Sequence, residues 1–189
     1  MGITVLGVLE LNSIAVGIQS MDAMVKKAPV SIVDAKIVCP GKFLILIEGD
    51  VASVEASLSA GRSAGKGHVV DELFIPNLHG SIIPAVKGTV AVEMWDAVGI
   101  IESFSVTAGI EAGDAAAKAA EVLITEIRLE TEMGGKSFVK MVGAIDAVEA
   151  AMEAGAALIR AKGLLCRDII IARPHPEIRP FFVKESKES

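Results

Sequence analysis

The sequence is poor in aromatic residues and in cysteine, and it has no cluster of basic residues. Its 189 residues include six Phe, one Trp and no Tyr, and the net charge is −6. Proteins that bind nucleic acids usually combine a basic face with stacking aromatic side chains. We therefore expect no nucleic-acid partner. Two cysteines also do not make a disulfide framework.

The sequence also lacks a long hydrophobic run. Hydrophobic residues make up 52% of the chain and the mean hydropathy is +0.55, but no segment approaches the roughly 18–20 apolar residues of a membrane span. We therefore expect no membrane partner. The opening residues lack the charged and apolar regions of a signal peptide, which favours a cytoplasmic location. Short segments rich in Ala, Val and Ile suit small domains with extensive subunit interfaces, so we expect an obligate oligomer.

What the sequence does contain is an internal repeat. Leu6-Gly7-Val8-Leu9-Glu10 recurs as Val98-Gly99-Ile100-Ile101-Glu102, an offset of 92. The offset becomes 94 where Gly41-Lys42 matches Gly135-Lys136, and 96 where His79 matches His175. A repeat of this length indicates two similar domains in one chain. We place them at residues 1–92 and 93–184, followed by a polar tail at 185–189.

Each copy shows hydrophobic periodicity in the order strand, helix, strand, strand, helix, strand. In the first copy the expected segments are 4–10, 13–27 (capped by Asn12 or Ser13), 30–38, 43–47, 50–64 and 69–75. In the second copy they are 97–102, a helix ending near 120, 122–130, 137–142, 146–161 and 164–172. Residues 76–96 are expected to be a linker. This order predicts two tandem ferredoxin-like βαββαβ domains of the α+β class, a fold that does not itself define a function.

Two short motifs recur in both copies: Gly7-Val8-Leu9-Glu10 with Gly99-Ile100-Ile101-Glu102, and Asp22-Ala23-Met24-Val25-Lys26 with Asp114-Ala115-Ala116-Ala117-Lys118. Two others occur once each: Glu48-Gly49-Asp50-Val51 at the end of the third strand of the first copy, and Ala172-Arg173-Pro174-His175 after the last strand of the second copy. With these motifs the sequence resembles bacterial microcompartment shell proteins that carry two shell domains in tandem.

The resemblance implies that three chains form a flat trimer, a pseudohexamer of six shell domains that tiles the shell of a microcompartment. The unpermuted order of the segments favours a single-layer trimer. The implied partners are further copies of the chain, other shell proteins and redox enzymes in the lumen. Family resemblance also places five residues at the edge where tiles meet: Lys26, Lys118, Arg173, His175 and His79.

The resemblance further implies that the turn between the second and third strands lines a central pore. The residues concerned are Cys39, Pro40, Gly41 and Lys42 in the first copy, and Met133, Gly134, Gly135 and Lys136 in the second. Cys39-Pro40-Gly41-Lys42-Phe43 is most similar to the T-type shell proteins of propanediol-utilisation compartments. In those proteins one cysteine per chain holds a 4Fe–4S cluster on the trimer axis. Cys39 is accordingly our candidate metal ligand, with electron transfer across the shell as the implied role.

Two other functions remain open. The chain could be a shell trimer with a gated metabolite pore and no cluster, or a ferredoxin-like regulatory protein that binds a ligand between its domains. No catalytic residue is expected, because Glu10 and Glu102 match by duplication and have no nearby His or Lys. The chain is therefore not expected to be an enzyme. Cys166 lies in an apolar segment and is expected to be a small buried residue.

Overall fold

The computed structural model describes residues 4–88, 90–92, 94–129 and 134–182. It divides into two compact units, with a division between Leu78 and His79. None of the helices in the described ranges combines the length and apolar character needed to cross a bilayer.

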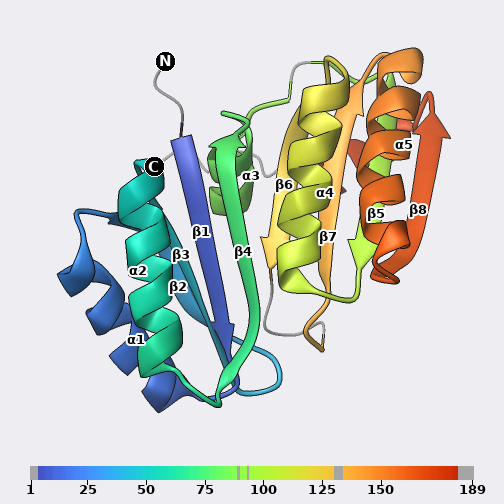
Figure 1. The fold of residues 1–189 in the computed structure, drawn as a ribbon. Helices are drawn as coiled ribbons and strands as arrows, with labels where there is room; N and C mark the ends of the chain where they lie inside the picture. The colour runs from blue at the N-terminus through green and yellow to red at the C-terminus, as the bar shows by residue number, and fades with distance from the viewer. Residues whose placement is uncertain (1–3, 89, 93, 130–133, 183–189) are drawn as a thin grey trace, which may run out of the picture. The chain divides into compact units, whose positions relative to one another are not determined.

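The first unit is a four-stranded antiparallel sheet with two helices on one face (Figure 1). Its elements are β1 (Thr4–Leu11), α1 (Ile14–Lys27), β2 (Ser31–Val38), β3 (Lys42–Gly49), α2 (Val51–Ala64) and β4 (Val69–Leu78). The strand order is β2-β3-β1-β4. This is the predicted split βαβ arrangement, in which the two halves of the repeat interleave in one sheet.

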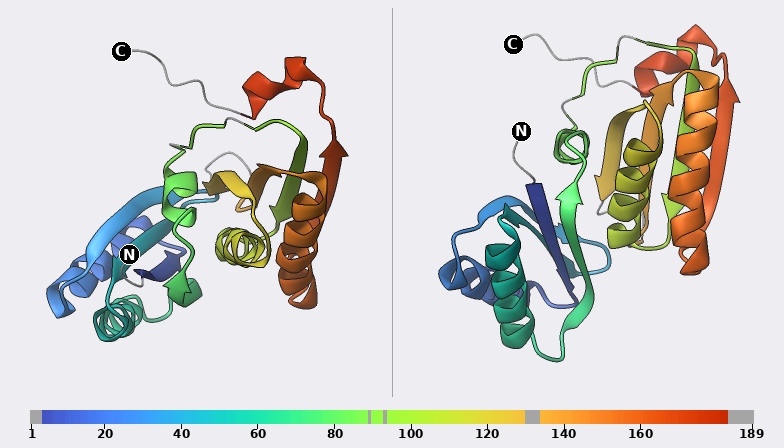
Figure 2. Two further views of the ribbon diagram at one scale, coloured as in Figure 1. Left: turned by 90° about the horizontal axis from the view of Figure 1, so that it is seen from above. Right: turned by 45° about the horizontal axis from the view of Figure 1, so that its top comes forward.

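The second unit repeats this architecture and adds a short helix at each end (Figure 2). Its elements are α3 (Ile82–Lys87), β5 (Ala97–Ser103), α4 (Val106–Ala119), β6 (Leu123–Leu129), β7 (Ser137–Gly143), α5 (Ile145–Ala161), β8 (Leu165–Ala172) and the 3₁₀ helix η1 (Pro176–Phe181). The strand order β6-β7-β5-β8 matches that of the first unit. The predicted fold is therefore confirmed in both copies.

Local side-chain chemistry sets where the helices begin. The Ser13 hydroxyl accepts a hydrogen bond from the backbone N–H of Val16, which caps α1. Asp50 caps α2 in the same way, accepting from the N–H of Ser53 at 2.9 Å. A hydrogen bond from the Ser53 hydroxyl is the main cause that lowers the pKa of the Asp50 carboxyl. These caps satisfy N–H groups that have no partner inside the helix.

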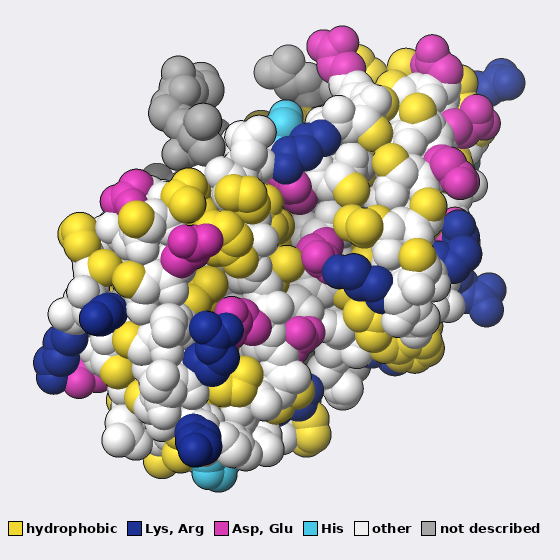
Figure 3. Space-filling model, in the orientation of Figure 1, with side chains coloured by type: hydrophobic (Ala, Val, Ile, Leu, Met, Phe, Trp, Pro, Cys, Tyr) yellow, Lys and Arg dark blue, Asp and Glu magenta, His cyan; other side chains and the backbone are white. Residues whose placement is uncertain are grey.

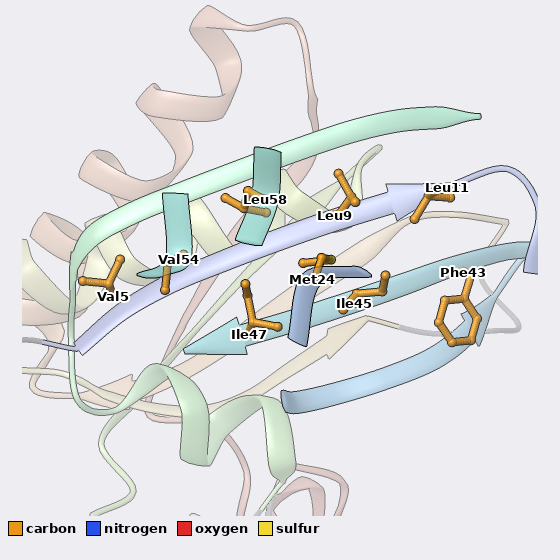
Figure 4. Close-up of a cluster of buried hydrophobic side chains, with 9 residues drawn as sticks. All are labelled: Val5, Leu9, Leu11, Met24, Phe43, Ile45, Ile47, Val54 and Leu58. Carbon is orange, nitrogen blue, oxygen red and sulfur yellow. The ribbon is translucent and has the colours of Figure 1, made fainter. Parts of the chain in front are cut away.

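Strand alternation builds the core of the first unit. Leu9 and Leu11 of β1 and Ile45 of β3 point towards the helices, where Met24 and Leu58 meet them (Figure 4). Successive side chains of a strand point to opposite faces of the sheet. The even-numbered residues of β1 and β3 therefore lie on the face away from the helices.

The predicted linker at 76–96 differs from the structure. Strand β4 continues to Leu78, and α3 occupies Ile82–Lys87. The helix ends at Gly88, whose φ of 68° is the left-handed conformation that favours glycine. Helix α3 packs against β6 and α4 within the second unit. Because this tertiary packing stabilises the helix, the local sequence pattern of its six residues did not indicate a helix.

Equivalent glycines in the two copies face different neighbours. A Cβ on Gly155 would lie 2.7 Å from the backbone oxygen of Ala112, because α4 and α5 approach closely there. A Cβ on Gly61 would instead meet the Met24 side chain at 2.6 Å. A methionine side chain can adopt another rotamer, whereas the backbone of a packed helix cannot move alone.

We expect Gly155→Ala to lower the free energy of unfolding by about 2 kcal/mol and Gly61→Ala by less than about 1 kcal/mol. Overpacking costs about 1–3 kcal/mol, and the better helix propensity of alanine offsets about 1 kcal/mol. Urea denaturation of the two variants measures the difference. Equal losses at the two positions would show that the backbone contact at Gly155 is not limiting.

Candidate functional site

The turn between β2 and β3 presents a free thiol. Cys39 follows the last residue of β2, is partly exposed and forms no disulfide. Gly41 has a φ of 68°, a conformation that side chains with a Cβ rarely adopt. Pro40 fixes its own φ. The local sequence thus builds a tight turn with the Cys39 side chain at its start.

Lys42, the last residue predicted to line the pore in the first copy, is held by a buried carboxylate. Its Nζ lies 2.8 Å from Oε1 of Glu10, whose side chain is only 3% exposed. The sequence-based interpretation that Glu10 has no nearby lysine is therefore wrong. The two residues are 32 positions apart, but strand alternation places both on the face away from the helices. Both residues have even numbers in their strands, and this shared position on one face was the one sequence signal that pointed to the pair.

The equivalent turn of the second copy has different chemistry. Gly134 and Gly135 have φ values of 63° and 84°, while Met133 lies outside the described residues. Lys136 Nζ lies 3.8 Å from Cys166 Sγ and 5.5 Å from the centre of the Phe104 ring. Lys136 thus contacts a thiol and an aromatic ring, where its counterpart Lys42 contacts a carboxylate.

Cys166 itself is partly exposed, so the prediction of a buried residue is wrong. The register between β5 and β8 shifts at this point. Glu102 pairs with Arg167 and Ser103 pairs with Leu165, and Cys166 falls between them without an opposite residue. A residue at such an irregularity does not follow strand alternation.

The described residues of a single chain offer too few ligands for a metal site. In the part of the chain that the structure describes, no group of three or more His, Cys, Asp or Glu side chains could hold a metal ion. Iron–sulfur clusters normally take four protein ligands, mostly thiolates. The partly exposed, unpaired thiol of Cys39 fits such a cluster only if other chains supply further thiolates.

The residues predicted at the tile edge are not equivalent in the two copies. Asp22 and Lys26 form an exposed i,i+4 ion pair at 2.6 Å. In the second copy Lys118 contacts Asp114, and the backbone N–H of His79 donates to Oδ1 of Asp114 at 2.7 Å. The structure thus brings His79 and Lys118 together on one carboxylate. Their role between tiles stays a prediction.

Arg173 and His175 lie together at the end of β8. Arg173 has a φ of 47° and donates its backbone N–H to the Asp96 carbonyl at 2.8 Å. His175 is exposed, and its Nδ1 accepts the backbone N–H of Glu177 at 3.3 Å. Arg173 and His175 are both exposed, and Nδ1 of His175 already has a partner within the chain.

A cluster of cations and aromatic rings fixes the C-terminal segment to β7. Lys140 Nζ lies 5.0 Å from the centre of the Phe138 ring and 5.3 Å from that of Phe182, and 2.8 Å from Glu126 Oε2. Burial raises the pKa of Glu126, but Lys140 and Arg128 outweigh it and leave that pKa below its usual value. A small adjoining hollow is lined by Gly88, Val90, Thr125, Glu126 and Phe182. Because Glu126 is already paired with Lys140 and Arg128, we interpret this cluster as structural rather than as a binding site.

Charges on the molecular surface are mixed. On the face shown in Figure 3, Lys and Arg side chains alternate with Asp and Glu over each unit, and no continuous basic area forms. This agrees with the net charge of −6. The phosphate backbones of nucleic acids bind to basic protein faces, and the face shown in Figure 3 is not basic.

Comparison with protein families identifies the two repeats. The BMC domain matches residues 5–78 and again residues 97–174. The chain belongs to the BMC domain family. Its two tandem domains are similar over most of their length to the bacterial microcompartment shell protein PduT of Citrobacter freundii, at 39% identity over 170 residues, 90% of this chain and 92% of that protein.

Other relatives agree with this membership. EutM, a shell protein of Salmonella typhimurium, is 38% identical over 79 residues, which is 41% of this chain and 82% of EutM. The crystal structure of a microcompartment protein from Desulfitobacterium hafniense DCB gives a TM-score of 0.90 at 40% identity, covering 94% of this chain and 99% of that one. The fused permuted hexameric shell protein MSM0275 shares the fold at a TM-score of 0.61 and 16% identity. The resemblance seen in the sequence to tandem-domain shell proteins is therefore confirmed.

Proposed function

We propose that this BMC protein is a structural, non-enzymatic tile of a cytoplasmic bacterial microcompartment shell. Three chains would form a trimer of six shell domains, which packs beside other shell proteins. Similarity to PduT over 90% of the chain supports the shell role. The exposed apolar side chains of Ile18, Ile37 and Ile169, each at least 41% exposed, support burial by further chains.

We propose further that Cys39 binds a 4Fe–4S cluster shared by the three chains. The single observation that carries this proposal is the free, partly exposed thiol at the start of a rigid turn. On a threefold axis, one cysteine per chain supplies three thiolates, and the fourth iron takes a ligand other than cysteine. When bound, such a cluster supplies one-electron redox chemistry, which would connect lumen redox enzymes with the cytoplasm.

The residues of this chain have distinct roles in that site. The thiolate of Cys39 is the metal ligand, since the thiolate rather than the thiol binds metals. Pro40 and Gly41 hold the turn in one conformation. Glu10 fixes the Lys42 ammonium on the sheet face, so the turn is anchored where β3 begins.

Anaerobic purification tests the proposal. A brown protein that contains about four iron and about four sulfide ions per trimer is the expected result. A colourless, iron-free trimer would contradict the cluster and favour the gated metabolite pore. Electron microscopy of the concentrated protein tests the shell role, because a tile forms hexagonal arrays whereas a ligand-binding regulatory protein forms discrete particles.

A further inference from the structure

The second unit brings an amine, a thiol and an aromatic ring together at one edge of its sheet. Strand β5 lies between β7 and β8. Ser103 at the end of β5 pairs with the first residue of β7 on one side and with the first residue of β8 on the other. Lys136, Phe104 and Cys166 each adjoin one of these paired residues in the sequence. The strand register therefore places all three side chains at the same edge.

The lysine ammonium lies against the sulfur atom. Nζ of Lys136 is 3.8 Å from Sγ of Cys166 and 5.5 Å from the centre of the Phe104 ring. The face of an aromatic ring attracts an ammonium group at this distance, which keeps the lysine beside the thiol. In the described ranges Lys136 takes part in no ion pair. Lys136 is exposed and Cys166 is partly exposed, so small solutes can reach the pair.

This pair has no counterpart in the first copy. At the offsets of 94, 92 and 96, the equivalent positions hold Lys42, Asn12 and Val70. Lys42 is held by the buried carboxylate of Glu10, and a valine side chain has no nucleophilic atom. A thiol beside a lysine is therefore a feature of the second copy that the repeat does not explain.

We propose that the Cys166 thiol and the Lys136 amine form a reversible covalent sulfur–nitrogen bond when hydrogen peroxide oxidises the thiol. Peroxide transfers one oxygen to the sulfur, which gives a sulfenic acid and releases water. The lone pair of the unprotonated amine then attacks the sulfur, the sulfenic oxygen leaves as water, and an S–NH bond remains. The thiol and the amine each lose one hydrogen overall, and these hydrogens reduce the peroxide to water. Backbone nitrogen atoms condense with sulfenic acids in the same way.

The position of Cys166 suits this bond. Cys166 falls at the register shift between β5 and β8, where it has no opposite residue. The lysine side chain is a flexible four-carbon stem, so Nζ can approach the sulfur without movement of the backbone. The bond joins the start of β7 to β8 and restrains the adjoining turn at Gly134 and Gly135. It also protects the sulfur from oxidation to a sulfinic acid, which is irreversible.

Peroxide treatment of the Cys39→Ser protein tests the bond, because Cys166 is then the only thiol of the chain. We expect two tryptic peptides joined through Lys136 and Cys166, with a mass about 2 Da below the sum of the separate peptides. Dithiothreitol should separate them, since thiols reduce an S–N bond to a thiol and an amine. Cys39 and any cluster are absent from this protein, so the result leaves the proposed function unaffected.

Lys136→Arg in the same background removes the nucleophile. The guanidinium keeps its positive charge beside Phe104 but does not lose a proton in proteins, so it has no reactive lone pair. We expect the Cys166 peptide to gain about 32 or 48 Da, as sulfinic or sulfonic acid, without recovery in dithiothreitol. Lys162→Arg, which changes an exposed lysine paired with Glu111, is the matched control and should cross-link like the parent. The same irreversible gain in the parent, or a cross-link that persists in Lys136→Arg, would overturn the proposal.

Discussion

Cys39→Ser is expected to abolish iron binding in the anaerobically purified protein. Iron and acid-labile sulfide should fall from about four each per trimer to near zero, and the brown colour should be lost. The physical reason is that a serine hydroxyl does not ionise near neutral pH and so does not replace a thiolate as ligand. Colorimetric iron and sulfide assays, with the visible absorption spectrum, measure the loss.

Cys166→Ser is the matched control, because it removes the only other thiol of the chain. Cys166 lies beside Lys136 in the second unit, and its removal should leave the iron content unchanged. Loss of iron in Cys166→Ser with retention in Cys39→Ser would show that Cys166 in β8 is the ligand and would contradict the role of Cys39. Sedimentation of both variants shows whether the iron was lost by chemistry or by failure to assemble.

Lys42→Met is expected to lower the free energy of unfolding by about 3 kcal/mol. Removing one partner of a buried ion pair costs about 3–5 kcal/mol, because the other charge is left without compensation. Here Glu10 is that charge, with its side chain 3% exposed, while the 24% exposure of Lys42 places the effect at the lower end. Equilibrium denaturation in urea measures the change.

Two further variants isolate the ion pair as the cause. Lys136→Met removes the equivalent lysine of the second copy, which contacts Cys166 and Phe104 rather than a carboxylate, and should cost less than about 1 kcal/mol. The double variant Glu10→Leu/Lys42→Met should recover most of the lost stability, because apolar residues can replace a buried ion pair. A double variant as unstable as Lys42→Met would assign the loss to packing instead.

The sequence was sufficient to predict the eight strands and the four long helices, in their order, but not the short helices α3 and η1. Helix starts were readable because Ser13 and Asp50 are capping residues placed directly before apolar helical patterns. The strand order followed from the repeated βαββαβ pattern, which has few compact solutions. The repeat then supplied the family, since motifs such as Asp22-Ala23-Met24-Val25-Lys26 recur in order.

The features that could not be predicted depend on contacts between distant residues. The pairing of Glu10 with Lys42 requires the register of β1 on β3, which single-sequence patterns do not specify. The exposure of Cys166 follows from a register shift between β5 and β8. The position of α3 follows from packing in the second unit. In each case the local sequence is compatible with more than one outcome, and tertiary contacts select between them.

The placement of α3 in the second unit has a consequence for assembly. Because the segment after Leu78 belongs to the same chain as the surface it contacts, its binding is intramolecular and has a high effective concentration. Two separate single-domain proteins would have to form this contact by collision. The tandem chain forms it while it folds, so the contact does not depend on protein concentration in the cell.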